Sequence, residues 1–402
     1  MWCKCVLLSI SSLRLPRILG RMAYNLMALS EQAIWDALRT VQEPDLGRDL
    51  VSLNMIKDLR ISPEGRVSLT VVLTTPACPL KARIESEVQA AVMRVPGVSG
   101  VEVQMTSNVT SMPQRAELLP GVRNIIGVAS GKGGVGKSTV SANLAIALAQ
   151  AGARVGLLDA DIYGPNQPLM LGLRDAQPEL RLVEAENGEQ VEMLLPVEKH
   201  GIKIMSMGFL IGEDQPVIWR GPMLNSALRQ FLGQVLWGDL DYLVVDLPPG
   251  TGDVQISLIQ LTRITGIVHV TTPQEVALQD VRKGLMMFQT QGIPLLGIVE
   301  NMSYFVCPHC SQPTEIFSRG GGRKLAEMYG VPFLGELPLA PEIRSASDEG
   351  VPLVIAAPDS EAAARYRQIA ETLAAQISIQ NYSATAGSGH LLSKRESEVA
   401  KP

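Results

Sequence analysis

The stretch that decides the fold is Gly131-Lys132-Gly133-Gly134-Val135-Gly136-Lys137-Ser138-Thr139. It follows an apolar run at 125–129 that predicts a buried strand, and it opens a segment at 139–150 with helical spacing. Glycines let backbone N–H groups turn toward phosphates, and a helix N-terminus adds the positive end of its dipole. Motif and context together therefore predict a phosphate-binding P-loop rather than a glycine-rich turn of chance composition.

Two polar side chains of this loop have separate predicted tasks. We expect Lys137 to neutralise the β- and γ-phosphate oxygens, and Ser138 to supply a hydroxyl ligand for Mg²⁺. The resulting cofactors are ATP and Mg²⁺. The nucleotide-binding residues predicted in the loop are Gly131, Lys132, Gly133, Gly134, Val135, Gly136, Lys137, Ser138 and Thr139.

Carboxylates follow two further apolar runs. Asp246 ends the run at 242–245, which is the Walker B arrangement, and we expect it to hold a Mg²⁺-bound water. Asp159 and Asp161 come directly after the run at 155–158. One of them would bind a water molecule held by the Mg²⁺ ion, and the other would orient the attacking water. The alternative for this pair is a solvated turn, because Asp is common in turns.

The pattern around these motifs predicts an α/β fold. Short apolar runs separated by helical segments are typical of a mostly parallel sheet with helices on both faces. The predicted strands of this P-loop ATPase domain, residues 122–377, are 125–129, 155–158, 202–205, 242–245, 267–270, 296–299 and 333–334. His269 falls inside one of these apolar runs and is interpreted as a core residue with its hydrogen-bonding groups satisfied, rather than as a ligand.

A smaller α+β domain is predicted before the ATPase domain, at residues 28–107. Its expected elements are helices at 29–42 and 80–93 and strands at 51–61, 67–73 and 98–105. A polar linker containing Pro113 and Pro120 follows at 108–121. The Ser-, Gly-, Lys- and Glu-containing segment 378–402 is predicted to be a disordered tail.

Composition narrows the classes of partner. The chain has 402 residues, a formal net charge of -5 and no dense Lys/Arg stripe, so we expect no nucleic acid as its main ligand. It has no run of about 18 apolar residues, so we expect no membrane partner. Five scattered cysteines are too few for a disulfide framework and favour a reducing compartment, the cytoplasm.

The N-terminal extension, residues 1–27, leaves the compartment open. It contains no acidic residue, several basic ones and a short apolar run, which resembles a weak organelle-targeting signal. The alternative, which we prefer, is an over-extended start, with Met22 or Met27 as the true first residue. If the segment is a transit peptide, the protein belongs in an organelle matrix.

A cysteine pair follows the predicted strand at 296–299. Cys307 and Cys310 can bind one metal centre together, but a 4Fe-4S cluster or a tetrahedral zinc ion needs four ligands. A homodimer would supply the other two if its two-fold axis passes through this loop. Two alternatives stay open: a dithiol oxidoreductase, and a structural zinc knuckle completed by His309 or by the partner.

Lys132, the second residue of the P-loop motif, places the chain in a narrower group. It marks the deviant Walker A proteins, and in this respect the sequence resembles MinD, ParA and the nitrogenase iron protein. The resemblance implies that Lys132 reaches across a homodimer to the partner's nucleotide, and that Asp161 supports hydrolysis.

Within that group, residues 122–370 resemble the Mrp/ApbC family of iron-sulfur cluster carriers. The motifs that carry the resemblance are Asp161-Ile162-Tyr163-Gly164-Pro165-Asn166, Trp219-Arg220-Gly221-Pro222-Met223, Asp246-Leu247-Pro248-Pro249-Gly250-Thr251-Gly252-Asp253 and Glu300-Asn301-Met302-Ser303. It implies an ATP-hydrolysing homodimer in which Cys307 and Cys310 hold a bridging 4Fe-4S cluster. It also implies that Asn301 contacts adenine, and that the partners are an iron-sulfur scaffold and apo-protein recipients.

Residues 29–106 resemble the SufT/PaaD-type domain of iron-sulfur biogenesis, whose characteristic cysteine aligns with Cys78. The stretch Thr74-Thr75-Pro76-Ala77-Cys78-Pro79 ends one predicted strand and begins a helix. Cys78 is thus expected near a helix N-terminus, where its thiolate would be stabilised. The alternative is a plain buried cysteine.

Two other functions compete with a cluster carrier. A MinD/ParA-like positioning switch would favour a basic amphipathic C-terminal helix or a DNA-binding stripe, and the segment 393–398 offers neither. A redox ATPase like the nitrogenase iron protein has its cluster cysteines far apart in sequence. Here Cys307 and Cys310 are close together.

Overall fold

A computed structural model describes residues 29–111, 118–162, 164–184, 188–210, 221–307 and 309–399. The N-terminal extension, Pro113 and three residues of the family motifs, Tyr163, Trp219 and Arg220, lie outside these residues. The chain divides into two compact units, the first made of the chain up to Val72 with Ala82–Met105, and the second of Leu73–Lys81 with the chain from Thr106. The segment Leu73–Lys81 therefore belongs with the ATPase unit, although the sequence places it inside the small domain.

The first unit contains a three-stranded sheet with strand order β3-β4-β5. Its helices and strands are α2 (Glu31–Leu38), β1 (Gln42–Glu43), β2 (Arg48–Asp49), β3 (Ile56–Ile61), β4 (Arg66–Leu73), α3 (Lys81–Met93) and β5 (Gly100–Ser107). The strand predicted at 51–61 corresponds to β3, which begins at Ile56, five residues later than predicted. Residues 50–54 form turns instead, because Met55 N–H donates to the Leu50 carbonyl and Asn54 adopts a left-handed φ of 57°.

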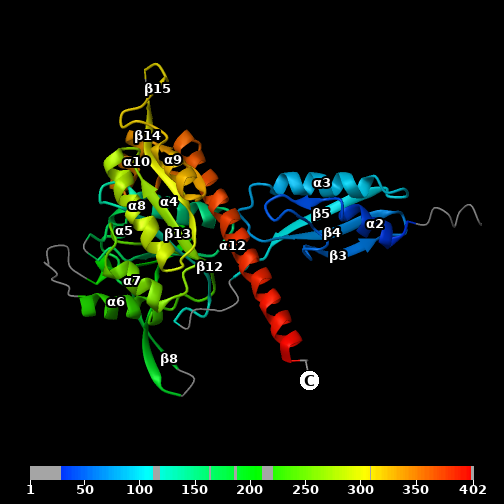
Figure 1. Ribbon diagram of the computed structural model, residues 1–402, viewed down its shortest axis with the longest axis horizontal. Coiled ribbons are helices and arrows are strands. Elements are labelled where there is room, and N and C mark those ends of the chain that lie inside the picture. The colour runs from blue at the N-terminus through cyan, green and yellow to red at the C-terminus, as the bar shows by residue number, and fades with distance from the viewer. Residues whose placement is uncertain are drawn as a thin grey trace, which may run out of the picture. The chain divides into compact units, whose positions relative to one another are not determined.

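The second unit is built on one large sheet (Figure 1). Its strands are β6 (Val122–Ser130), β7 (Val155–Asp159), β10 (Val197–Lys199), β11 (Ile202–Ser206), β12 (Leu240–Asp246), β13 (Gly266–Thr271), β14 (Leu295–Val306), β15 (Pro313–Thr314) and β16 (Phe333–Pro338). Among the described residues their order is β10-β11-β7-β12-β6-β13-β14-β15, with β16 paired to β14. Only β10 and β15 pair antiparallel, so the predicted mostly parallel sheet is confirmed.

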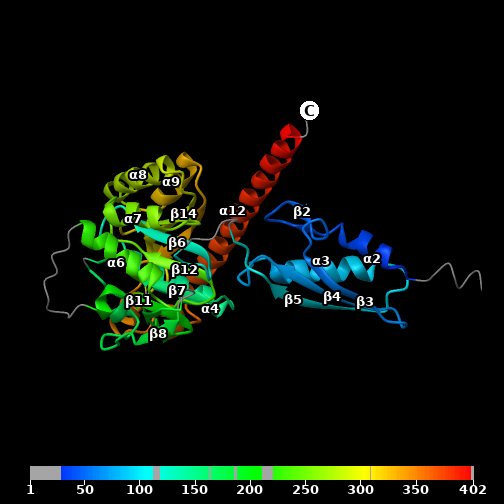
Figure 2. The ribbon, with the colours of Figure 1, turned by 90° about the horizontal axis from the view of Figure 1, so that it is seen from below.

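Helices cover both faces of this sheet (Figure 2). They are α4 (Lys137–Gln150), α5 (Gln167–Met170), α6 (Gly221–Gly233), α7 (Asp253–Leu261), α8 (Glu275–Thr290), α9 (Gly321–Tyr329), α10 (Pro341–Asp348), α11 (Leu353–Ala356) and α12 (Glu361–Val399). On one face α4 packs against α11 and α12, and on the other α8 packs against α9. A short helical turn, Met207–Phe209, and a hairpin of β8 (Leu180–Glu184) and β9 (Gln190–Leu194) complete the unit.

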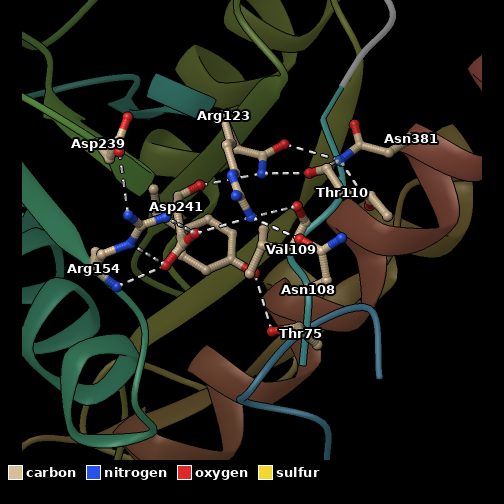
Figure 3. Close-up of polar contacts among 11 residues, drawn as sticks. Thr75, Asn108, Val109, Thr110, Arg123, Arg154, Asp239, Asp241 and Asn381 are labelled. Carbon is tan, nitrogen blue, oxygen red and sulfur yellow. Dashed lines mark hydrogen bonds and ion pairs between the residues drawn. The ribbon is translucent and has the colours of Figure 1, made fainter. Parts of the chain in front are cut away.

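The N-terminal ends of the parallel strands are tied together by polar side chains (Figure 3). Asp241 accepts hydrogen bonds from Arg154 Nε and NH2 at 3.3 and 3.1 Å, and it lies 3.4 Å from Arg123 NH1. Arg123 also donates to the Asn108 side chain and the Val109 carbonyl, each at 3.0 Å. This edge thus holds the start of the predicted linker, while the opposite edge is left for ligand.

The C-terminal helix differs from the predicted tail. Helix α12 continues past residue 378, and Ser378 and Asn381 are buried. Asn381 Nδ2 donates to the Thr110 carbonyl at 3.0 Å and to Asn124 Oδ1 at 2.9 Å. These partners are distant in sequence, so composition alone gave no sign of them. In the described part of the chain, neither α12 nor any other helix combines the length and apolarity needed to cross a membrane.

His269 is a core residue of β13, as predicted. Its ring is 1% exposed and lies edge-on to Phe288, with ring centroids 5.7 Å apart. The prediction that its hydrogen-bonding groups are satisfied is wrong, because neither ring nitrogen has a partner among the described residues. Burial lowers the pKa of His269 to about 4. The ring is therefore neutral at neutral pH and serves packing.

Candidate functional site

The carboxyl ends of β6, β7 and β12 meet at one edge of the sheet. Asp246, the last residue of β12, lies in register with Val128 of β6 and with Asp159 of β7. Proteins with an open α/β sheet bind ligands outside the carboxyl ends of the strands, at the point where the strand order reverses. The acidic residues predicted from two separate apolar runs are thus brought together by strand pairing.

The P-loop connects β6 to α4 and has the backbone that the motif requires. Gly134 and Gly136 have left-handed φ angles of 81° and 83°, which favour glycine. Gly136 is the N-cap of α4, and a Cβ atom there would lie 2.3 Å from Asn301 Nδ2. The glycine is therefore needed for conformation and for space.

Lys137 is held in a buried ion pair at the first turn of α4. Its side chain is 6% exposed, with Nζ 2.5 Å from Asp246 Oδ1, 3.7 Å from Asp161 Oδ2 and 3.4 Å from Ser138 Oγ. Ser141 Oγ also donates to Asp246 Oδ1, at 3.0 Å. The predicted phosphate-binding lysine, the Walker B carboxylate and the predicted metal-binding hydroxyl are therefore neighbours.

The two aspartates after β7 occupy different positions. Asp159 is fully buried and accepts hydrogen bonds from Ser206 Oγ at 2.8 Å and Gln167 N–H at 3.2 Å. Burial raises its pKa to about 8, and the neighbouring Asp246 carboxylate adds to that increase. Burial also raises the pKa of Asp161, against the opposing effect of the Lys137 ammonium. Of the two, Asp161 lines the cavity and Asp159 lies beneath it.

A cavity of about 770 Å³ opens in front of the P-loop, a volume suited to a nucleotide-sized ligand. Its lining contains Asp161 and most of the predicted loop residues: Lys132, Gly133, Gly134, Gly136, Lys137, Ser138 and Thr139. It does not include Gly131, Val135, Asp159, Asp246 or Asn301.

Two glutamines at the site were missed by sequence reasoning. Gln167 is fully buried, and its Nε2 donates to the Ser138 carbonyl and to Asp246 Oδ2, both at 3.0 Å. Gln255 is also fully buried and donates to the carbonyls of Pro248 at 2.7 Å and Gly250 at 3.0 Å, which shapes the loop after β12. A glutamine has no motif of its own, so only the fold could reveal these contacts.

Asn301 lies on β14, behind the P-loop. It is 5% exposed; its Nδ2 donates to the Val135 carbonyl at 2.9 Å, and its Oδ1 accepts from Met302 N–H at 3.0 Å. Both ends of its amide are thus bonded within the protein. The adenine contact stays a prediction.

The cysteine pair lies in the hairpin loop between β14 and β15, which stands at the top of Figure 1. Cys307 is half-buried and Cys310 is exposed. Hydrogen bonds close the loop, because Ser311 N–H donates to the Cys307 carbonyl at 2.8 Å and Cys307 N–H donates to the Gln312 carbonyl at 3.1 Å. Backbone hydrogen bonds from His309 and Cys310 lower the pKa of the Cys307 thiol. The pair is thus accessible, and the hydrogen bonds around Cys307 stabilise its thiolate.

Cys78 lies in the segment between β4 and α3. It is half-buried and forms no disulfide, and Lys81 N–H donates to its carbonyl at 3.3 Å just where α3 begins. This is the predicted placement near a helix N-terminus. No role for its thiol follows from this placement.

Known proteins share both parts of this architecture. The model of the NUBPL iron-transfer P-loop NTPase family matches residues 121–374, and the model of iron-sulfur cluster assembly proteins matches residues 31–105. The chain is 53% identical to an iron-sulfur cluster carrier protein of Synechocystis sp. over 87% of this chain and 99% of that one. It is 42% identical to the Escherichia coli iron-sulfur cluster carrier protein over 85% of this chain and 90% of that one.

Among solved structures, a nucleotide-binding protein from Archaeoglobus fulgidus in complex with ADP is similar to this chain. It is 40% identical, covers 58% of this chain and 89% of that one, and has a TM-score of 0.50.

Proposed function

Because this chain belongs to the NUBPL iron-transfer P-loop NTPase family, we propose that it is an ATP-hydrolysing carrier that binds an iron-sulfur cluster and transfers it to apo-proteins. The observation that carries the proposal is the presence, in one unit, of a formed P-loop and an accessible cysteine pair. Cys307 and Cys310 lie on the loop that continues β14, and β14 also supplies Asn301 to the back of the P-loop. The relatives named iron-sulfur cluster carrier proteins support the same function.

ATP would bind with its phosphates over the N-terminus of α4. The backbone N–H groups of the loop and the helix dipole would hold the phosphate oxygens, and Lys137 would turn from Asp246 toward the β- and γ-phosphates. The hydroxyl oxygen of Ser138 and the carboxylate oxygens of Asp246 are hard ligands that suit Mg²⁺. That they accept a cation is supported by the Lys137 ammonium, which lies 3.4 Å from Ser138 Oγ and 2.5 Å from Asp246 Oδ1. Bound Mg²⁺ would neutralise charge that develops on the phosphates.

Asp161 is the residue best placed to orient the attacking water. It lines the cavity, and its carboxylate is 3.7 Å from Lys137 Nζ, on the side where the terminal phosphate would lie. Asp159 would act through its contacts with Ser206 and Gln167, which fix the end of β7. We therefore assign hydrolysis to Asp161 and Lys137, with Lys132 supplied by the partner subunit.

The cluster is the cargo in this proposal. Each chain would provide the thiolates of Cys307 and Cys310, and a homodimer would provide the four ligands that a 4Fe-4S cluster needs. An exposed loop suits a cluster that is given away, because both loading and release require access. The first unit, with Cys78 beside it in sequence, would assist exchange with scaffold and recipient proteins.

Cluster transfer tests this function directly. Protein reconstituted with iron and sulfide would be mixed under anaerobic conditions with the apo-form of a 4Fe-4S enzyme, and the enzyme's activity followed with and without Mg-ATP. We expect the enzyme's activity to return when the cluster-loaded protein is added. The control receives an equal amount of free iron and sulfide together with a chelator that captures the iron, and its activity should not return. A loaded protein that never restores the enzyme under either condition contradicts the carrier function.

Lys132→Ala should retain ATP binding and lose hydrolysis, because its ammonium acts on the nucleotide of the partner. Lys132→Ala and Lys137→Ala subunits, each inactive alone, would be mixed with different tags and assayed for phosphate release. In a mixed dimer, one site keeps its own Lys137 and receives Lys132 from the partner. Random mixing in equal amounts should therefore restore about a quarter of the parent activity per chain. Full turnover by the Lys132→Ala homodimer, or no recovery in purified mixed dimers, contradicts the action across the dimer.

A further inference from the structure

Two adjacent residues of β14 contact the two halves of the proposed site. Successive residues of a strand point to opposite faces of its sheet. Asn301 contacts the P-loop through the Val135 carbonyl, at 2.9 Å. Glu300 contacts the segment that follows the cysteine pair, through the N–H groups of Gly320 and Gly322. One peptide bond therefore separates a contact with the nucleotide loop from a contact with the cysteine-bearing segment.

The contact with the P-loop leaves Asn301 little freedom. Its Oδ1 accepts from Met302 N–H at 3.0 Å, and Met302 has a left-handed φ of 56°, so the strand bends directly after the asparagine. Gly136 approaches so closely that a Cβ atom there would lie 2.3 Å from Asn301 Nδ2. A shift of the P-loop backbone at Val135 and Gly136 would therefore displace Asn301.

Glu300 is a fully buried carboxylate that clamps the start of α9. Its Oε1 accepts from Gly320 N–H at 2.8 Å, and its Oε2 accepts from Gly322 N–H at 2.5 Å. Ser303 Oγ donates to Oε1 at 2.5 Å. A carboxylate at a helix N-terminus bonds N–H groups that have no partner within the helix. Because both oxygens are used, Glu300 fixes where the segment returning from the cysteines joins α9.

A second carboxylate, that of Glu336, also binds residues at the two ends of the segment that contains the cysteines. Glu336 on β16 accepts from Ser303 Oγ at 3.2 Å and from Arg319 Nε at 3.1 Å. The Arg319 guanidinium also lies over the Tyr304 ring, 4.7 Å from its centroid. Both ends of the segment that contains Cys307 and Cys310 are thus anchored: the outgoing end at Ser303 and Tyr304 of β14, and the returning end at Arg319, just before α9.

We propose that the dipeptide Glu300–Asn301 is the positioning element through which occupancy of the P-loop sets the conformation of the cysteine loop, Cys307–Arg319. Phosphate binding at the P-loop moves the Val135 carbonyl; Asn301 follows, and Glu300 shifts the N-terminus of α9 and the segment attached to it. β14 is paired with β13 and with β16 as far as Glu300, and its pairing with β16 is interrupted between Glu300 and Tyr304. The displacement of Asn301 therefore reaches Glu300 through the peptide bond that joins the two residues. This inference rests on the proposed function, and assigns its nucleotide dependence to two residues that touch neither cysteine.

The test uses the full-length, cluster-free, reduced protein and measures alkylation of Cys307 and Cys310 by iodoacetamide, resolved by peptide mass spectrometry. Rates are compared without nucleotide and at saturating Mg²⁺ with a non-hydrolysable ATP analogue. In the parent protein we expect the nucleotide to change the rate at one or both cysteines by at least about fivefold, the lower end of the usual coupling between sites. In Glu300→Gln the ratio should fall to about one while analogue binding persists. In Asn301→Ala the ratio should also fall to about one, measured at an analogue concentration that saturates this variant.

A variant outside the nucleotide site guards against misinterpretation if Asn301→Ala weakens binding. A Cβ atom at Gly322 would lie 3.1 Å from Glu300 Oε2, so Gly322→Ala disturbs the hydrogen bonds between Glu300 and the start of α9. The substitution lies outside the P-loop. It should also remove the effect of the nucleotide on the alkylation rate. Lys324→Ala is the matched control, an exposed residue of α9 that should keep the parent ratio. The connection is wrong if Asn301→Ala and Gly322→Ala respond to nucleotide as the parent does, or if the parent shows no response. Cluster binding by the same preparations is assayed separately, and its absence would contradict the proposed function instead.

Discussion

Replacing Lys137 with alanine should abolish detectable ATP hydrolysis. Its ammonium is the buried cation at the P-loop, 6% exposed and 2.5 Å from Asp246, in a site where water is scarce and charge is poorly screened. Removing a single group that stabilises transition-state charge costs about 10²–10³-fold in kcat, which takes a slow ATPase below detection. Phosphate release at saturating Mg-ATP measures the loss, and cluster binding should survive it.

A folding control accompanies this variant, because Lys137→Ala leaves the Asp246 carboxylate buried without its ammonium. Ser141 and Gln167 still donate to that carboxylate, so we expect the sheet to form, as thermal unfolding would show. Lys283→Ala is the matched lysine control, since Lys283 is exposed on α8 and pairs only with Asp280 among the described residues. A folded Lys137→Ala protein that hydrolyses ATP at the parent rate contradicts the P-loop assignment.

The second large effect is expected at the cysteine pair. In a symmetric dimer, Cys307→Ala removes one thiolate from each subunit, and therefore two of the four ligands of a bridging cluster. Cys310→Ala does the same. Iron retained after anaerobic reconstitution should fall to near background for either single change. Nucleotide binding should persist in both, because the P-loop follows β6 and contains no thiol.

Cys78→Ala is the matched cysteine control. It should keep the parent's iron content and show slower delivery to a recipient, because Cys78 is expected to assist transfer rather than to hold the cluster. The bridging model fails if iron stays bound at parent stoichiometry in Cys307→Ala. It also fails if Cys78→Ala empties the site while both changes at the pair leave it filled.

The parts of the fold that sequence could predict are those fixed by local pattern. Apolar runs buried on both sides predicted the parallel strands of the large sheet, and a motif of fixed spacing predicted the P-loop at the end of β6. Asp246 was predictable because it ends such a run, and its pairing in register with Asp159 follows once the strands are neighbours. The family resemblance then supplied the carrier function, which the relatives share by name.

Contacts between distant segments could not be predicted in the same way. Gln167 reaches Asp246 across 79 positions, and Asn301 reaches Val135 across 166, with no feature of either residue type that indicates the partner. Helix α12 was missed for a related reason, since Asn381 is buried by bonds to Thr110 and Asn124 rather than by an apolar pattern. Such polar contacts depend on which elements the fold brings together.

One measurement bears most directly on the central claim that this chain carries a cluster between two subunits. Protein purified without oxygen would be analysed for iron, acid-labile sulfide and zinc, alongside its visible absorption and its molar mass in solution. The account predicts a coloured dimer with broad visible absorption and about four iron and four sulfide per two chains. A colourless protein with zinc at Cys307 and Cys310, or a monomer that holds a complete cluster by itself, would contradict it.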